Sequence, residues 1–538
     1  MKRTALVVAL ALLTFGPRAG TADPPKLAVI IVVDQMRADY IDRFKGDWTA
    51  GLKRLVTEGA WFRRASYPYL LTVTCAGHAT IATGSFPNRH GIFSNQWWDR
   101  TAGRQVTCTE DEAVANIGYD GPAKEHNSAA RLRVETFADR LRTGRGSHVA
   151  TLSIKPRSAI MLAGHGGDAV TWISEAHDRW LTSAAFSKGP VPEVARFIGD
   201  HPVAEDFGKS WTPLFPLERY RGSDAGVGER AVPGWTPTFP HVLKGTAGKQ
   251  DETFRVQWET SPFADAYFAN MAATLAEDLR LGKHDGTDVL GISFSSLDLV
   301  GHKFGPRSVE LQDQLARLDR TLGALLDRLD AAVGRGRYVV ALTADHGVTA
   351  VPEQLTAEHV DGGRIDAAKI VQTVEAALQP QLGAGPHVAK LDRRDLNVYF
   401  AAGAYDRLRA SPPLMDRVLR TIAAAPGVQQ VFRAEELRDA VRSTDAWRRA
   451  AALSYVEGRS GDIIIAPRPG WIGADEAASH GTASPDDQRV PILFMGHGIK
   501  AGRYDQPVTP ADIAPTLAAI CGITMPQAEG RVLRGALK

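Results

Sequence analysis

The chain has 538 residues, of which 44% are hydrophobic and 23% are charged, a composition ordinary for a globular protein with a large core. The formal net charge is +2, and the Lys and Arg residues are scattered without a basic block. This balance gives no support to binding of nucleic acid or of an anionic membrane, so we expect neither as a partner.

The N-terminus has the three parts of a secretory signal peptide. Lys2 and Arg3 are positive, residues 4–15 are apolar, and small residues precede a cleavage point after Ala22. The apolar run is too short to span a bilayer, although an uncleaved anchor is the alternative. Removing residues 1–22 takes away three basic residues and lowers the net charge from +2 to −1. We therefore predict a periplasmic or secreted protein without stable membrane insertion.

Several apolar, β-branched runs are typical of strands buried on both faces of a parallel sheet. They span residues 27–33, 148–154, 288–296, 337–344 and 490–496. An amphipathic helix lies between the third and fourth runs, with its apolar face formed by Leu311, Leu315, Leu318, Leu322, Leu325 and Leu329. The alternation predicts an α/β fold, a doubly wound, mostly parallel sheet with helices on both faces.

Two segments depart from this pattern. Residues 190–255 are rich in Pro, Gly and aromatic residues, and we expect an irregular cap packed over the core. Residues 360–470 contain a helix–strand–helix–strand pattern, which predicts a small α+β lobe inserted between core strands. Residues 23–538 are therefore expected to form one catalytic domain with two insertions.

Polar residues cluster where the predicted strands end. In open parallel sheets, ligands bind beyond the carboxyl ends of the strands. Carboxylates and imidazoles without thiolates suit zinc or another borderline divalent ion. This number of ligands suits two ions about 4 Å apart that clamp the oxygens of a phosphoryl transfer. The candidate ligands are Asp34, Asp298, His302, Asp345, His346 and His480.

The stretch TVTCAGHATIATG, residues 72–84, predicts a helix that begins at this edge of the sheet. Free N–H groups at a helix start favour an anion, and Thr74 there is a candidate alkoxide nucleophile. Cys75 is the rival, because thiolates are also favoured at helix starts, but it points about 100° away from Thr74. The cysteines Cys75, Cys108 and Cys521 allow one disulfide, whose partners the sequence does not name.

These motifs resemble the alkaline phosphatase superfamily, and most closely its bacterial threonine-nucleophile members of the PafA type. The resemblance covers most of the mature chain, in the order VVDQMRADY, TVTCAGH, IFSNQWWD, SIKPR, SLDLVGH, TADHG, SHG and DIAPTLAAICG. It implies an alkaline-phosphatase-like fold and a zinc-dependent enzyme that hydrolyses phosphate monoesters through a covalent phosphothreonine.

The resemblance also assigns roles to residues of this chain. It implies that Thr74 is the nucleophile, bridging toward the second zinc, and that Asn95, Lys155 and Arg157 contact the non-bridging phosphate oxygens. The resemblance assigns no role to His78, which we interpret as a structural, hydrogen-bonding histidine. The implied zinc ligands are Asp298, His302 and His480 for one ion, and Asp34, Asp345 and His346 for the other.

Other functions remain open at this point. A phosphodiesterase of the nucleotide pyrophosphatase type shares the metal cluster and the threonine, but it typically lacks the Lys–Arg pair of SIKPR, which Pro156 separates here. Sulfatases need C-x-P-x-R or S-x-P-x-R, which CAGHA around Cys75 does not provide. An exported binding protein without activity is a third alternative. We expect a monomer that acts on small-molecule phosphate monoesters.

Overall fold

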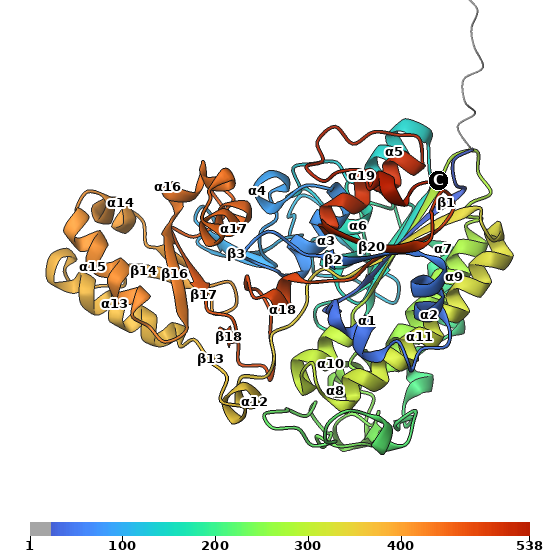
Figure 1. The fold of residues 1–538 in the computed structure, drawn as a ribbon, viewed down its shortest axis with the longest axis horizontal. Coiled ribbons are helices and arrows are strands. Elements are labelled where there is room, and N and C mark those ends of the chain that lie inside the picture. Colours follow the sequence, from blue (N-terminus) through green and yellow to red (C-terminus); the bar gives the residue numbers. More distant parts are fainter. Residues whose placement is uncertain (1–22) are drawn as a thin grey trace, which may run out of the picture.

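The computed structural model describes residues 23–538, so the predicted signal peptide lies outside the described residues. Its main body is built on a ten-stranded mixed sheet covered by helices on both faces (Figure 1). In spatial order the strands are β20 (Gly502–Val508), β2 (Ala60–Ala65), β19 (Ile492–Gly496), β12 (Tyr338–Thr343), β1 (Leu27–Val33), β11 (Asp288–Phe294), β6 (Val149–Ser153), β7 (Ala169–Ile173), β8 (Trp180–Ser183) and β5 (Asn116–Gly118).

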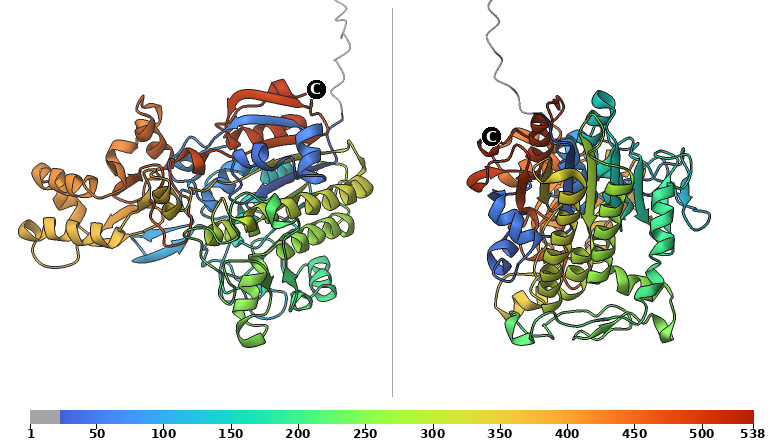
Figure 2. Two further views of the ribbon diagram at one scale, coloured as in Figure 1. Left: turned by 60° about the horizontal axis from the view of Figure 1, so that its bottom comes forward. Right: turned by 90° about the vertical axis from the view of Figure 1, so that its right-hand side faces the viewer.

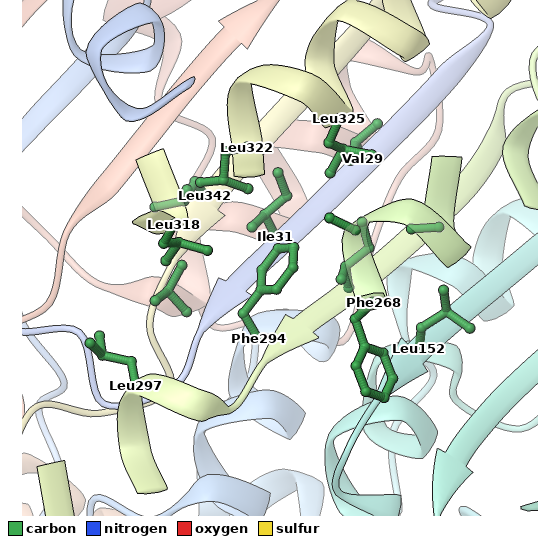
Figure 3. Close-up of a cluster of buried hydrophobic side chains, with 14 of the residues drawn as sticks. Val29, Ile31, Leu152, Phe268, Phe294, Leu297, Leu318, Leu322, Leu325 and Leu342 are labelled. Atoms are coloured by element: carbon green, nitrogen blue, oxygen red, sulfur yellow. The ribbon is translucent and has the colours of Figure 1, made fainter. Parts of the chain in front are cut away.

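The central strand β1 shows why its sequence is apolar throughout. Every residue of β1 is buried, and alternate side chains enter opposite layers of the core. Val29 and Ile31 pack with helices α2 (Gly51–Glu58), α9 (Pro262–Asp278) and α11 (Val309–Leu329), as Figure 3 shows for part of this cluster. Ile30 and Val32 pack instead with α5 (Phe137–Arg145) and α19 (Ile513–Ile520). This two-sided burial confirms the predicted α/β fold.

Strand β19 corrects one detail of the predicted sheet. It runs antiparallel to both of its neighbours, β12 and β2, whereas β12, β1, β11, β6 and β7 are mutually parallel. A continuous apolar run indicates burial on both faces and contains no signal for strand direction. The consequence is functional, because Ile492 at the start of β19 pairs with Thr343 at the end of β12. The loop before β19 therefore reaches the same sheet edge as the loop after β12.

A second sheet lies in the chain between β12 and β19. Its four antiparallel strands are ordered β14 (Val388–Leu391), β15 (Asn397–Phe400), β17 (Ile463–Pro467) and β16 (Val428–Arg433). Helices α13 (Ala367–Leu382) and α15 (Pro412–Ala423) pack on it around a core of its own. We call this unit the lobe, and it stands beside the main body in Figure 1 and in the left view of Figure 2.

Residues 190–255 contain only short elements, chiefly α7 (Pro192–Asp200), β9 (Ser210–Trp211) and β10 (His241–Val242). They pack against the helix pair formed by α10 (Ser296–Phe304) and α11. His241 bonds to Glu310 at 3.0 Å, and Asp313 accepts hydrogen bonds from Trp211 and Tyr220. In the described part of the chain, no helix has both the length and the apolar character needed to cross a bilayer.

Candidate active site

The predicted ligands gather at one edge of the sheet because several elements end or begin there. Asp34 follows β1, and Asp345 and His346 follow β12. Asp298 and His302 lie one turn apart on α10, which follows β11. His480 lies in the loop that precedes β19, so the antiparallel direction of β19 brings it to this edge. Helix α3 (Thr74–Thr83) begins beside them.

Asp34, Asp345 and His346 form one candidate metal group, and all three are fully buried. Nε2 of His346 lies 3.4 Å from Asp34 Oδ1 and 3.4 Å from Asp345 Oδ2. Nδ1 of His346 faces the carbonyl oxygen of Gly347 at 2.9 Å, so Nδ1 holds the proton and Nε2 presents a lone pair. Among the described residues, neither Asp34 Oδ1 nor Asp345 Oδ2 receives a hydrogen bond. Three lone pairs that converge in a buried place need a cation, and this donor set fits zinc.

Asp298, His302 and His480 form the other predicted group. Nε2 of His302 and Nε2 of His480 lie 3.2 Å and 3.8 Å from Asp298 Oδ1. Each ring donates its Nδ1 proton to a backbone carbonyl, of Ala478 at 2.9 Å and of Thr72 at 2.8 Å, so both Nε2 atoms present a lone pair on the side of the carboxylate. The geometry brings all three predicted residues together and fits a second zinc ion.

The two groups are neighbours. The rings of His346 and His480 stack with their centroids 3.5 Å apart. The ligand atoms that lie within 4.8 Å of one another around Asp298 belong to Asp298, His346 and His480, and this closer group does not include His302. Burial, followed by the nearby His346 and His302, lowers the pKa of His480 well below its ordinary value. Burial, followed by Asp298 and Asp345, raises the pKa of Asp34. The imidazole of His480 is thus held in the neutral form that binds metal. The clustered carboxylates around Asp34 favour a cation between them.

Lys155 makes a contact that the sequence did not predict. Its ammonium lies 2.6 Å from Asp34 Oδ2 and 2.5 Å from Asp298 Oδ2, one carboxylate from each candidate metal group. Burial disfavours the charged ammonium, but Asp298 and Asp34 outweigh it and raise the pKa of Lys155. Lys155 therefore lies charged between the two groups, at the N-cap of α6 (Pro156–Ala163).

Thr74 is the first residue of α3 and is almost completely buried. Its hydroxyl oxygen lies 3.4 Å from Nε2 of His346. His78 fixes this helix start, because its Nδ1 bonds to the Thr74 carbonyl oxygen at 2.8 Å and its Nε2 to the Ser293 hydroxyl at 2.8 Å. The structural role expected for His78 agrees with these contacts.

Cys75 is excluded as the rival nucleophile in this structure, because it forms a disulfide with Cys108. The remaining cysteine, Cys521, is buried. A disulfide-bonded sulfur has no thiolate to attack with. The pairing also anchors the start of α3 to the segment that follows β4 (Arg104–Thr107).

Asn95 and Arg157 line a cavity of about 670 Å³ beside His480. The side-chain oxygen of Asn95 accepts a hydrogen bond from the Cys75 backbone N–H at 2.8 Å, which leaves its amide N–H groups as donors. Nε of Arg157 is buried and has no hydrogen-bond partner among the described residues. Both side chains are therefore available to an anion in the cavity.

Sequence reasoning missed Gln35, which follows the ligand Asp34. Its side-chain Nε2 donates to Asp298 Oδ1 at 2.6 Å, and its backbone N–H donates to Asp345 Oδ1 at 3.2 Å. Gln35 is fully buried and has a φ of 68°, an uncommon conformation for a residue other than Gly. Its position next to a predicted ligand was the only signal in the sequence.

Comparison with known proteins places this site in a family. The family profile described as type I phosphodiesterase / nucleotide pyrophosphatase matches residues 28–486. Alkaline phosphatase PafA of Elizabethkingia meningoseptica is 32% identical over 511 residues, 93% of this chain and 92% of that protein. Alkaline phosphatase PhoV of Synechococcus elongatus is 32% identical over 96% of this chain and 94% of its own length.

The fold agrees with these matches. The crystal structure of wild-type PafA superposes with a TM-score of 0.89 at 30% identity, covering 96% of this chain and 100% of that one. The chain therefore belongs to the type I phosphodiesterase / nucleotide pyrophosphatase family of the alkaline phosphatase superfamily.

Proposed function

We propose that this enzyme is an alkaline phosphatase that hydrolyses phosphate monoesters through a phosphothreonine at residue 74, in a site that holds two zinc ions. It is a phosphatase by its similarity to PafA and PhoV over nearly the whole chain. The observation that carries the mechanism is the position of the Thr74 hydroxyl, 3.4 Å from the ligand nitrogen of His346.

The proposed zinc ligands follow from the donor atoms described above. Asp298, His302 and His480 would hold one ion, and Asp34, Asp345 and His346 would hold the other, with the Thr74 oxygen beside it. When bound, two such ions supply positive charge to the attacking and leaving oxygens of a phosphoryl transfer.

The proposed reaction has two displacements. The Thr74 oxygen, having lost its proton, forms a bond to phosphorus while the bond from phosphorus to the leaving alcohol oxygen breaks, and that oxygen takes up a proton. Water then attacks phosphorus and the bond to the Thr74 oxygen breaks. That oxygen takes up one proton of the water, and inorganic phosphate is released. The start of α3 supports the first step, because its backbone N–H groups favour negative charge at this point.

The proposed phosphate-binding residues are Lys155, Arg157 and Asn95. A monoester has three non-bridging oxygens and up to two negative charges. Arg157 supplies a fork of N–H donors, Asn95 supplies neutral donors, and the buried ammonium of Lys155 supplies a point charge next to both ligand groups.

The second candidate function is a phosphodiesterase, which the name of the matching family favours. A diester has one charge fewer, because a second oxygen carries an alkyl or aryl group and only two oxygens stay non-bridging, so it offers less to Lys155 and Arg157. The positive charges of Lys155 and Arg157 near the site therefore support monoesters as the preferred substrates.

We propose a periplasmic or secreted location. The Cys75–Cys108 disulfide supports it, because disulfides persist mainly in oxidising compartments. The signal peptide and the monomeric state remain predictions.

Two measurements test this proposal. The first is kcat/KM for an aryl phosphate monoester, the matching diester and the matching sulfate, with zinc present. The monoester should be preferred, and a preferred diester would support the second candidate. The second is elemental analysis of fully active protein, which should find two zinc ions per chain, whereas one ion or none would contradict the two-ion site.

A further inference from the structure

The cavity beside the site extends well beyond the phosphate-binding residues. Its volume of about 670 Å³ lies in the range of pockets that enclose whole organic ligands, and a phosphoryl group fills only a small part of such a space. Asn95, Arg157 and His480 line it on the side of the main body. The leaving group of an ester whose phosphorus is held there has room in the remaining space.

The other residues that line the cavity come mainly from the lobe. Lys390, Asp392 and Asp395 line the cavity from the end of β14 and the turn that leads to β15. Gln105 of strand β4 completes this lobe-side wall, and its Nε2 donates to Asp392 Oδ2 at 2.9 Å. Residues 190–255 contribute none of the described residues that line the cavity, so the cap expected from the sequence does not form this wall.

Asp395 is the buried polar group of this wall. It is 5% exposed, its Oδ1 accepts a hydrogen bond from the backbone N–H of Asn397 at 3.1 Å, and its Oδ2 has no hydrogen-bond partner among the described residues. Burial, followed by Asp392, raises the pKa of Asp395. A buried carboxyl oxygen without a partner is costly unless a ligand group bonds to it.

Lys390 lies half-buried in the same wall and forms no ion pair with any of the residues that the structure describes. Its ammonium can donate to hydroxyl oxygens of a ligand. Lys390 therefore offers a donor, and Asp395 places a buried carboxyl with an unpartnered oxygen in an adjacent part of the lobe.

The described residues that line the cavity include no large aromatic side chain. Among the described residues that line the cavity, none is Phe, Tyr or Trp, and the apolar members are small or aliphatic: Val73, Ala367, Ala368, Val371 and Leu391. Bases and aryl rings bind proteins largely by stacking on aromatic side chains. Hydroxyl groups, in contrast, both donate and accept hydrogen bonds and match a wall of amide, carboxyl and ammonium groups.

We propose that the lobe-side wall of Gln105, Lys390, Asp392 and Asp395 is a leaving-group subsite for aliphatic, hydroxyl-bearing alcohols, such as the sugar of a sugar phosphate. This inference rests on the proposed phosphatase function, and it adds the class of ester that the site prefers.

The test compares three primary alkyl esters, so that intrinsic reactivity is similar: ethyl phosphate, glucose 6-phosphate and AMP. The wild-type enzyme should show its highest kcat/KM on glucose 6-phosphate. Lys390→Ala and Asp395→Asn should each lower that value about threefold to tenfold, the effect of one lost hydrogen bond, and change ethyl phosphate less than twofold. Lys369→Ala is the matched control, because Lys369 is exposed on α13 of the same lobe and does not line the cavity.

The outcomes are distinguishable. Equal wild-type values for ethyl phosphate and glucose 6-phosphate, or a preference for AMP, would overturn the subsite while leaving the phosphatase function intact. Equal losses on both alkyl esters in the two variants would also overturn it, because the residues would then act on the phosphate or on folding. Failure to hydrolyse any of the three esters with zinc present would overturn the proposed function itself.

Discussion

The hydroxyl oxygen of Thr74 lies 3.4 Å from Nε2 of His346, at the start of a helix whose next residue is locked in a disulfide. This relationship joins a candidate nucleophile to a candidate metal ligand that comes from a distant strand end. It also separates Thr74 from Cys75, the two residues between which the sequence alone left a choice.

The Cys75–Cys108 disulfide should stabilise the folded protein and take no part in the hydrolysis reaction. Replacing both Cys75 and Cys108 with Ser should lower the free energy of unfolding by about 2–4 kcal/mol, because the bond closes a loop with a sequence separation of 33 in the unfolded chain. Chemical denaturation measures this loss, with Cys521→Ser as a control for removing a cysteine outside the bond. If the double variant folds normally and yet loses several orders of magnitude in kcat, the sulfur has a chemical role and the assignment of Thr74 is in doubt.

Gln35 should position the metal ligands. Its amide donates to Asp298 and its backbone N–H to Asp345, so losing the amide should weaken zinc binding about 10- to 100-fold. Gln35→Ala and Gln35→Gly separate two causes, since Gly accepts the φ of 68° without strain and Ala does not. Zinc retention during dialysis against a chelator measures the effect. Wild-type retention in Gln35→Gly would show that only backbone conformation matters at this position.

Lys155 and Arg157 should set the preference for monoesters. The double variant Lys155→Ala/Arg157→Ala should lose far more kcat/KM on a phosphate monoester than on a matched diester, because the diester offers these cations less charge. Zinc content must be measured alongside, since Lys155 also contacts Asp34 and Asp298. If the zinc content is unchanged, equal losses of kcat/KM on both substrates would make a phosphodiesterase the better-supported function.

His90 should make the protein sensitive to acid. Its Nδ1 accepts from the Ile92 N–H at 3.1 Å, and burial, followed by Arg459, lowers the pKa of His90 to about 3. The native protein keeps this ring neutral, whereas the unfolded chain protonates it below about pH 6.5. Stability should therefore fall by about 1.4 kcal/mol per pH unit from this residue as pH drops from about 6.5 toward 3. Unfolding of wild type and His90→Gln across this range measures the difference, and identical slopes would show that His90 is protonated in the native state.

The parts of the fold that follow from hydrophobic pattern were predictable. Strand β1 spans Leu27–Val33, as the apolar run predicts, and the candidate ligands after β1, β11 and β12 meet because parallel strands end at one edge. The direction of β19 was not predictable, because a strand buried on both faces has the same composition in either direction. His480 reaches the site only through that direction.

The sequence also could not predict contacts between segments that are far apart in the chain. Nothing in SIKPR indicates that Lys155 lies between Asp34 and Asp298. Nothing in the composition of the lobe places Lys390 and Asp395 beside the proposed phosphate-binding residues. Such contacts depend on how separate layers of the fold pack, and local periodicity contains no information about that packing.

The central claim is that Thr74 is the nucleophile, and trapping the phosphorylated enzyme tests it most directly. After rapid acid quench during turnover of a phosphate monoester, peptide mass spectrometry should locate one phosphoryl group on Thr74. Thr74→Ala should trap none and lose several orders of magnitude in kcat, while Thr74→Ser should keep measurable activity and become phosphorylated at the same position. A phosphoryl group on any other residue, or full activity in Thr74→Ala, would contradict the account.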